Sequence, residues 1–203
     1  MSNDLFSSAA HLRYNISVKR DVVRRFALRG RPSLMSFIPQ EDAMKKVGII
    51  MGSDSDLPVA QKAVDMLKSL EVPYEVHIYS AHRTPEEARA FALDARKNGF
   101  GAIIAMAGMA AHLAGALAAN TTIPVIGIPC KSGPLAGMDA LLATVQMPTG
   151  IPVATVAIDG GGNAALLAAQ IIAVEDAELA EKLDAKRRAD SAKVLDKNSK
   201  LDI

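Results

Sequence analysis

The fold is indicated most clearly by one stretch, which reads Val47-Gly48-Ile49-Ile50-Met51-Gly52-Ser53-Asp54-Ser55-Asp56. Its first half is a continuous apolar run, which is typical of a strand that is buried on both faces. Its second half is a polar turn, and Pro58 just beyond it suits the first turn of a helix that extends to Leu70. The stretch therefore predicts a buried strand, a polar loop and a helix, in that order.

The same order of elements recurs along the rest of the chain. Extended segments are expected at 74–79, 102–106, 124–128 and 153–158, and helices at 85–98, 113–120, 138–145 and 163–174. A charged amphipathic helix is expected from about 176 to 197. Continuous apolar strands that alternate with helices predict an α/β fold, in which helices cover both faces of a doubly wound parallel sheet.

The composition excludes several classes of protein. Half of the 203 residues are hydrophobic and 22% are charged, so the chain can bury a core. Cys130 is the only cysteine, which excludes an internal disulfide framework and a Cys-rich zinc site. No 18 consecutive residues are all apolar, which argues against a membrane-spanning helix. A net charge of +1, the absence of Trp and 4% aromatic residues give no reason to expect nucleic acid.

The N-terminal part of the chain differs in charge from the remainder. Residues 1–40 hold seven Lys or Arg against two acidic residues, whereas residues 41–203 hold sixteen against twenty. We therefore expect an irregular basic extension at 1–43 and a folded domain at 44–203, whose C-terminal helix begins at about 176. The extension is consistent with a misplaced start ahead of Met44, a functional tail or a targeting peptide.

Polar or glycine-rich segments follow each predicted strand, at 52–56, 80–85, 107–112, 129–137 and 159–163. In doubly wound sheets, ligands bind outside the carboxyl ends of the strands. We therefore expect the functional site where these five segments meet.

The segment from Gly52 to Asp56 can bind an anion, because it lies at a helix N-terminus and offers hydroxyl and N–H donors. It matches neither a Walker loop nor a dinucleotide fingerprint. Its two aspartates would repel a phosphate, so at least one of them needs another task, such as holding ribose hydroxyls. Plain helix capping by Ser and Asp explains these residues equally well.

The segment Ser80-Ala81-His82-Arg83-Thr84-Pro85 places a hydroxyl, an imidazole and a guanidinium on one loop, with Thr84 expected to cap the next helix. Ser80 and Arg83 suit a phosphate, and His82 can move a proton near neutral pH. The alternative is a solvated loop. An arginine near a helix N-terminus opposes the macrodipole, which favours the functional interpretation.

Three further features stay open. His112 has small apolar neighbours, so a buried structural histidine is at least as plausible as a functional one. The turn before the Ala-rich helix, Gly160 to Asn163, is either a mobile substrate loop or a tight turn that Asn163 caps. Cys130 has no histidine beside it in sequence, which makes a nucleophile unconvincing, and no spacing marks a metal site.

Taken together and in order, five segments resemble the bacterial 5-(carboxyamino)imidazole ribonucleotide mutases of purine biosynthesis. They are Met51 to Asp56, Ser80 to Pro85, Ala110-Ala111-His112-Leu113, Gln146-Met147-Pro148 and Asn163 to Ala168. The resemblance covers about Val47 to Val174. It implies a three-layer flavodoxin-like fold, a cytoplasmic homo-octamer with active sites between subunits, and no metal or organic cofactor. It also implies a small-molecule nucleotide substrate, a functional link to the carboxyaminoimidazole ribonucleotide synthase, and no nucleic-acid or membrane partner.

The resemblance also implies roles for individual residues. His82 matches the general acid/base, which serves while the substrate carboxylate moves from the exocyclic nitrogen to the ring carbon. The residues expected to bind substrate are Ser53, Asp56 and Arg83 on the nucleotide, Ser80 on its phosphate, and Gly52, Gly108 and His112.

The chain departs from the family pattern at Ala114, where many members have proline, and in a shorter 159–162 loop. A sister class carboxylates aminoimidazole ribonucleotide directly, tends to carry Lys in place of Arg83 and lacks the segment with His112. These two residues therefore favour the mutase. The other classes considered are a flavodoxin-like binding module and an FMN electron carrier.

Overall fold

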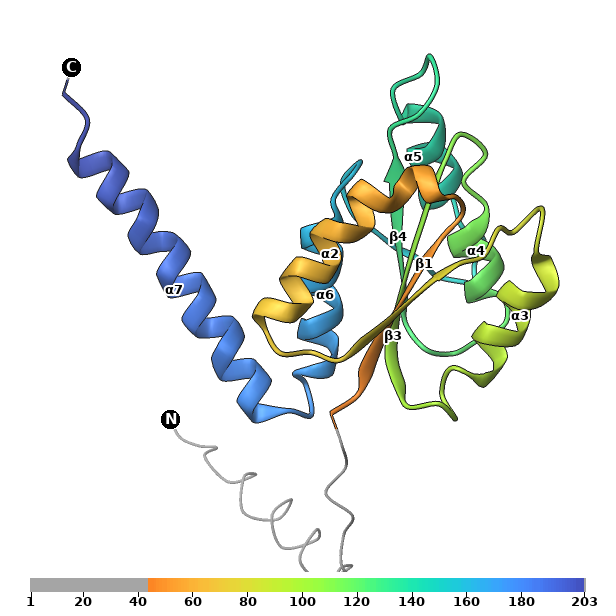
Figure 1. Ribbon diagram of the computed structural model, residues 1–203, viewed down its shortest axis with the longest axis horizontal. Coiled ribbons are helices and arrows are strands. Elements are labelled where there is room, and N and C mark those ends of the chain that lie inside the picture. The colour runs from red at the N-terminus through yellow and green to blue at the C-terminus, as the bar shows by residue number, and fades with distance from the viewer. Residues whose placement is uncertain (1–43, 203) are drawn as a thin grey trace, which may run out of the picture. The chain divides into compact units, whose positions relative to one another are not determined.

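Five parallel strands form the centre of the structure, a computed structural model that describes residues 44–202 (Figure 1). The expectations for residues 1–43 lie outside the described residues. The strands are β1 (Lys46–Met51), β2 (Tyr74–Ile78), β3 (Phe100–Gly108), β4 (Val125–Cys130) and β5 (Ala154–Thr155). A short 3-10 turn, η2 (Asp54–Asp56), leads into the first helix. The helices are α2 (Leu57–Ser69), α3 (Pro85–Asp94), α4 (Leu113–Ala118), α5 (Met138–Val145), α6 (Gly161–Ile172) and α7 (Ala177–Ser199).

The strands lie in the order β2-β1-β3-β4-β5, and every neighbouring pair is parallel. In the register of the sheet, Ile49 pairs with Val76 on one side and with Ile104 on the other. The chain moves outward from β1 in both directions, so the topology reverses between β1 and β3. A doubly wound sheet opens a crevice at such a point, at the carboxyl ends of the strands.

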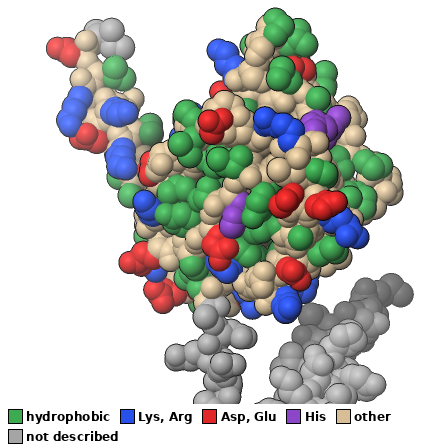
Figure 2. Space-filling view, turned by 45° about the vertical axis from the view of Figure 1, so that its right-hand side comes forward, with side chains coloured by type: hydrophobic (Ala, Val, Ile, Leu, Met, Phe, Trp, Pro, Cys, Tyr) green, Lys and Arg blue, Asp and Glu red, His purple; other side chains and the backbone are tan. Residues whose placement is uncertain are grey.

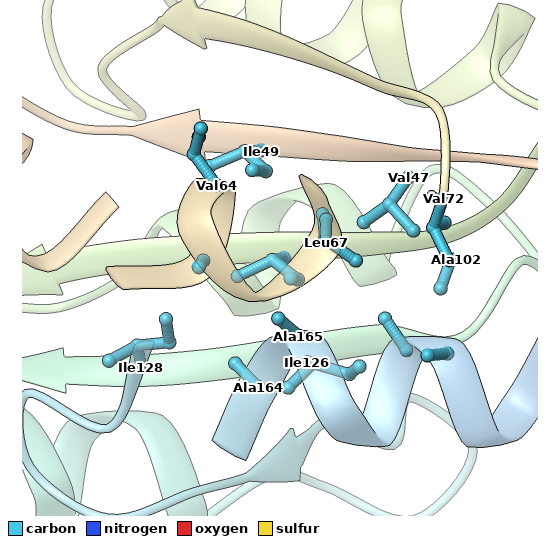
Figure 3. Packing of buried hydrophobic residues seen from close by; sticks show 14 of the residues in the cluster. Val47, Ile49, Val64, Leu67, Val72, Ala102, Ile126, Ile128, Ala164 and Ala165 are labelled. Atoms are coloured by element: carbon cyan, nitrogen blue, oxygen red, sulfur yellow. The ribbon is translucent and has the colours of Figure 1, made fainter. Parts of the chain in front are cut away.

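One face of the sheet is covered by α2 and α6, whose apolar side chains meet every second residue of the strands. Figure 3 shows this core, in which Ile49 and Ile126 from the sheet lie near Leu67 of α2 and Ala165 of α6. The intervening strand residues face a second core with α3 and α4, where Ile50 is buried. The central strands are therefore buried on both faces, which explains their continuous apolar sequences.

Close helix packing requires a glycine at the first position of α6. A Cβ on Gly161 would collide with the carbonyl oxygen of Val59 in α2, so only glycine allows this approach. Helix α6 begins at Gly161 with Gly160 as its N-cap. The expectation that Asn163 caps this helix is therefore wrong, because Asn163 already lies inside its first turn.

Several other boundaries differ from the predicted ones, and β3 extends over 100–108 where 102–106 was expected. Strand β5 is an edge strand of two residues instead of the expected six, because it pairs with β4 only through Ala154 and Thr155. Helix α3 ends at Asp94, and hydrogen-bonded turns continue to Gly99, whose φ of 81° stops the chain from extending the helix.

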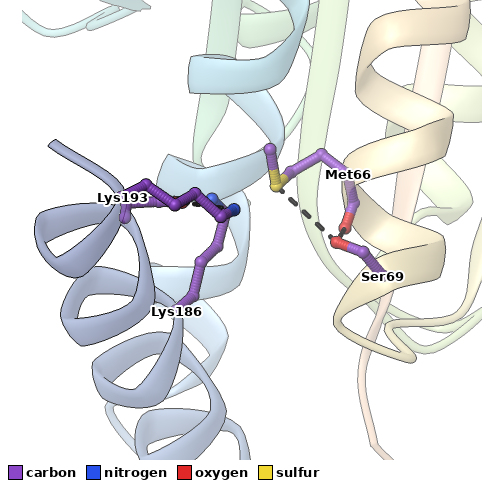
Figure 4. A network of polar contacts seen from close by, with 5 residues as sticks. Met66, Ser69, Lys186 and Lys193 are labelled. Carbon is purple, nitrogen blue, oxygen red and sulfur yellow. Dashed lines mark hydrogen bonds and ion pairs between the residues drawn. The ribbon is translucent and has the colours of Figure 1, made fainter. Parts of the chain in front are cut away.

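Helix α7 extends away from the sheet, and about half of its side chains are charged (Figures 1 and 2). Its first turns are anchored, because Leu179 is fully buried and Lys182 contacts Glu71 at 2.7 Å. Figure 4 shows Lys186 and Lys193, which contact Asp190 at 2.6 and 3.4 Å within the same helix.

In the last turn of α2, also drawn in Figure 4, the Ser69 hydroxyl donates a hydrogen bond to the carbonyl oxygen of Met66 over 2.7 Å.

Among residues 44–202, no helix combines the length and apolar character needed to cross a membrane.

Candidate active site

A cavity of about 450 Å³ opens at the carboxyl ends of the strands. It is lined by the loops after β1 and β2, by the end of β3 and the turn after it, and by Ser132 after β4. The expectation that the segment 159–163 also meets the site is wrong, since none of its residues lines this cavity. All eight candidate residues from the sequence line this cavity: Gly52, Ser53, Asp56, Ser80, His82, Arg83, Gly108 and His112. The cavity therefore lies at the edge and at the topological reversal where ligands of doubly wound sheets bind.

The loop after β1 turns one of its aspartates inward. The Ser53 hydroxyl accepts a hydrogen bond from the backbone N–H of Ser55 at 3.3 Å and so caps the short η2 turn. Asp54 is exposed, whereas Asp56 is only 8% exposed. Ser53 therefore caps the turn, as the capping interpretation expects. Asp56 is the aspartate of this loop that lines the cavity.

Burial raises the pKa of the Asp56 carboxyl above its ordinary value. Hydrogen bonds from the Ser53 backbone and the Cys130 side chain act in the opposite direction without cancelling the effect of burial. Burial, together with the charges of Asp56 and Asp159, also raises the pKa of the Cys130 thiol to about 12. Cys130 therefore stays protonated, which agrees with the doubt that it is a nucleophile.

The loop after β2 is held by its own side chains. The Ser80 hydroxyl accepts hydrogen bonds from the backbone N–H groups of His82 and Arg83, at 3.3 and 3.2 Å. Thr84 is the N-cap residue of α3 as expected, with Pro85 as the first helical residue. Its hydroxyl makes no capping bond to the helix, because it accepts from the N–H of Ser80 at 2.7 Å and so closes the loop. Arg83 reaches across to the loop after β1, where its guanidinium donates to the carbonyl oxygen of Gly52 over 2.9 Å.

Two histidines from different loops meet at the cavity. His82 Nε2 lies 2.8 Å from His112 Nδ1, and the rings stand edge to face at 77°. One nitrogen donates and the other accepts in this hydrogen bond. Both side chains are exposed, so the alternative of a buried structural histidine at His112 is wrong. In the space-filling view, histidine and basic side chains lie next to each other on this face (Figure 2).

The backbone after β3 is tightly turned, which aims His112 toward His82. Met109 has a φ of 50°, an unusual value for a residue with a side chain. The N–H of Ala111 bonds the carbonyl of Met109 at 2.9 Å, and the N–H of His112 bonds that of Ala110 at 2.8 Å. Backbone strain of this kind is often found at functional sites.

Residue-type reasoning missed several cavity-lining residues, of which Ser132 carries a polar side chain from the loop after β4. The sequence places Ser132 in the Gly- and Pro-rich segment 129–137 after a strand, but this pattern does not distinguish Ser132 from the other residues of the segment. Within the described part of the chain, no three His, Cys, Asp or Glu side chains gather as they would around a metal ion.

A doubly wound parallel sheet with a histidine pair, an arginine and serine hydroxyls at its carboxyl edge defines an α/β protein with a small-molecule site at the switch point. The chain belongs to the AIR carboxylase family, whose model matches residues 46–193.

The chain is similar to proteins named N5-carboxyaminoimidazole ribonucleotide mutase. The protein from Pyrococcus abyssi is 59% identical over 140 residues, which are 69% of this chain and 80% of the relative. The protein from Bacillus subtilis is 52% identical over 157 residues, 76% of this chain and 97% of the relative. Among solved structures, Treponema denticola PurE superposes with a TM-score of 0.71 at 32% identity, over 77% of this chain and 98% of that one.

Proposed function

We propose that this protein is an isomerase of purine biosynthesis that converts 5-carboxyaminoimidazole ribonucleotide into 5-amino-4-carboxyimidazole ribonucleotide. The observation that carries the proposal is the pair His82 and His112, which meet at 2.8 Å in a cavity that also contains Arg83. A proton carrier beside a phosphate-binding cation suits a reaction on a phosphorylated heterocycle. The named activity of relatives at 50–59% identity supports the same conclusion.

The nucleotide binds along the loops after β2 and β1. Arg83 and Ser80 bind the phosphate, because the guanidinium fork matches phosphate oxygens and a hydroxyl adds a donor. Ser53 and Asp56 take the ribose, since a carboxylate accepts hydrogen bonds from hydroxyls but repels a phosphate. Gly52 lets the backbone approach the substrate, and Gly108 lines the cavity at the end of β3.

His82 donates one proton and later accepts one, so it ends the reaction in its starting protonation state. Protonated His82 donates to the exocyclic nitrogen, the bond between that nitrogen and the carboxyl carbon breaks, and carbon dioxide leaves. The ring carbon then forms a bond to carbon dioxide, and neutral His82 removes the proton from that carbon. His112 orients the imidazole of His82 through their hydrogen bond and contributes to substrate binding.

The cavity keeps the intermediate in place. Carbon dioxide that remains beside the ring carbon reacts at a high effective concentration, because the step is then intramolecular in character. Exclusion of water prevents its loss as bicarbonate. Neither step uses a metal or an organic cofactor.

We also propose that the protein assembles into a homo-octamer, with active sites between the subunits. Helix α5 exposes Met138, Leu142 and Val145 to 53%, 53% and 48%, and their spacing places them on one face. Exposed apolar stripes of this kind mark protein contacts. Sedimentation velocity tests this part, since a monomer at micromolar concentration would contradict it.

We further propose that the enzyme is cytoplasmic and that residues 44–203 carry its activity. Its function is linked to that of the synthase that makes its substrate. The match of the family model to residues 46–193 supports the domain boundary. In the phosphoribosylaminoimidazole carboxylase of Candida glabrata, 43% identical over 192 residues, the matched region is 32% of a longer chain, which supports the link.

The proposed function is tested by supplying the two possible substrates separately. Purified protein is given 5-carboxyaminoimidazole ribonucleotide, or aminoimidazole ribonucleotide with bicarbonate, and the carboxylated ring product is followed by NMR. We expect fast conversion of the first only. Conversion of the second alone would assign the protein to the carboxylases that act directly on carbon dioxide.

A further inference from the structure

The cavity contains more substrate-binding surface than the family residues account for. At the carboxyl edge, the loops follow the strand order, so Ser80 and Arg83 lie after β2 and Ser132 lies after β4. Two to three strand spacings separate these positions, because the Arg83 guanidinium reaches Gly52 after β1, and this is about 10–14 Å at about 4.8 Å per spacing. A phosphate bound after β2 therefore places the opposite end of the nucleotide near β3 and β4.

The substrate carries a second negative group, and the protein has to bind this group near β3 and β4. The substrate carries a phosphate and a carboxylate, yet Arg83 is the one Lys or Arg side chain among the described residues that line the cavity. If Arg83 binds the phosphate, none of the described cavity-lining Lys or Arg side chains is left for the carboxylate. A neutral donor suits this group, because a permanent cation would stabilise the carboxylate more than the carbon dioxide it becomes, whereas the proton on His82 is transferred as the bond breaks.

Ser132 supplies a neutral donor in the right place. Its side-chain oxygen is buried and makes no hydrogen bond with any part of the chain between residues 44 and 202. A buried polar group without a partner is costly, and such groups in native proteins call for an explanation. Because Ser132 lines the cavity, a ligand that enters it is the natural partner after a turn about the Cα–Cβ bond of the serine.

Gly108 is what makes room for this hydroxyl. A Cβ built on Gly108 would lie 2.0 Å from Ser132 Oγ, which is far inside contact distance. The hydroxyl therefore stands directly over the end of β3, beside the turn that carries His112. This contact gives Gly108 a specific reason to be glycine, which is to admit the side chain of the neighbouring loop.

We propose that Ser132 recognises the migrating carboxyl group, by donating its hydroxyl hydrogen to a carboxylate oxygen of the nucleotide. This inference rests on the proposed function and adds a residue that discriminates between carboxylated and uncarboxylated nucleotides. Ser132 keeps the carboxyl group at the β3 and β4 end, within reach of the histidine pair, while the phosphate stays with Arg83.

The test compares two nucleotides by calorimetry on the full chain, with no need for turnover. The ligands are 5-amino-4-carboxyimidazole ribonucleotide and aminoimidazole ribonucleotide, which differ by the carboxylate. In Ser132→Ala, we expect Kd for the carboxylated nucleotide to rise about tenfold or more, as for loss of a hydrogen bond to a charged group. We expect Kd for the uncarboxylated nucleotide to change less than about twofold.

The control variant is Ser69→Ala, which removes a hydroxyl bonded within α2, outside the cavity-lining set, and should leave both Kd values unchanged. Thermal melting checks that Ser132→Ala is folded, and its melting temperature should equal or exceed that of the wild type because a buried unpaired hydroxyl is removed. Equal weakening of both nucleotides, or of neither, overturns the role of Ser132. Failure of the wild type to bind either nucleotide instead contradicts the proposed function, and this inference with it.

Discussion

His82 Nε2 lies 2.8 Å from His112 Nδ1, although 30 residues separate them and the two loops follow different strands. Because one nitrogen must donate and the other accept, the bond fixes the tautomer of each ring relative to the other. The bond also joins the two rings into one hydrogen-bonded unit, in which His112 holds the imidazole that the proposed isomerisation uses to give and take back a proton.

Replacement of His82 tests that role. His82→Asn should keep nucleotide affinity but lower kcat by roughly 10²–10⁴-fold, since an amide hydrogen-bonds but cannot transfer a proton at neutral pH. Steady-state kinetics with calorimetry of nucleotide binding checks both parts. Activity within about threefold of the wild type would remove His82 from the mechanism.

Arg83 should act through both charge and shape. Arg83→Lys keeps the charge but loses the fork, so we expect nucleotide binding to weaken by about tenfold and to remain salt-dependent. Arg83→Gln should bind still more weakly, with a smaller dependence on salt, because the charge is gone. Kd measured at low and high salt separates the two effects. An unchanged salt dependence in Arg83→Gln would show that another group holds the phosphate.

The charged Asp56 carboxylate should lower the stability of the folded protein, although it contributes to nucleotide binding. Burial raises its pKa in the folded protein, so the folded state binds this proton more tightly than the unfolded state does. The carboxyl therefore costs no stability below the ordinary aspartate pKa of about 3.9, and its cost grows as the pH rises through the raised value.

Asp56→Asn should accordingly melt at a higher temperature than the wild type at neutral pH, and the difference should vanish in acid. The same variant should bind nucleotide about tenfold more weakly, because a charged acceptor for ribose hydroxyls is lost. Calorimetric melting across pH tests the first part. A variant that melts lower at neutral pH would mean that the Asp56 charge is stabilised by its neighbours rather than strained by burial.

Cys130 should be inert in the folded enzyme. With a thiol pKa of about 12, on the order of one molecule in ten thousand carries the thiolate at about pH 8. A disulfide exchange reagent should therefore leave the native protein unmodified and react with one thiol after denaturation. Rapid reaction of the native protein would show that the thiol is neither buried nor protonated as described.

Much of the fold follows from the sequence, because continuous apolar strands and polar carboxyl-edge segments are local patterns. Those patterns placed all eight candidate residues at one edge, and the structure gathers them around one cavity. The burial of Asp56 and the exposure of Asp54 depend on the conformation of the short η2 turn. No local pattern contains that information, nor the approach of Ser132 to Gly108, which brings together loops from two strands.

The most direct test of the isomerase follows the carboxyl carbon itself. Wild-type protein is given substrate labelled with ¹³C in its carboxylate, in buffer that contains unlabelled bicarbonate, and the reaction is followed by ¹³C NMR. The account predicts that the label moves from the exocyclic nitrogen to the ring carbon with little dilution, because carbon dioxide stays in the cavity beside His82 and Ser132. A product that carries unlabelled carbon from bicarbonate, or no conversion of the labelled substrate, would contradict it.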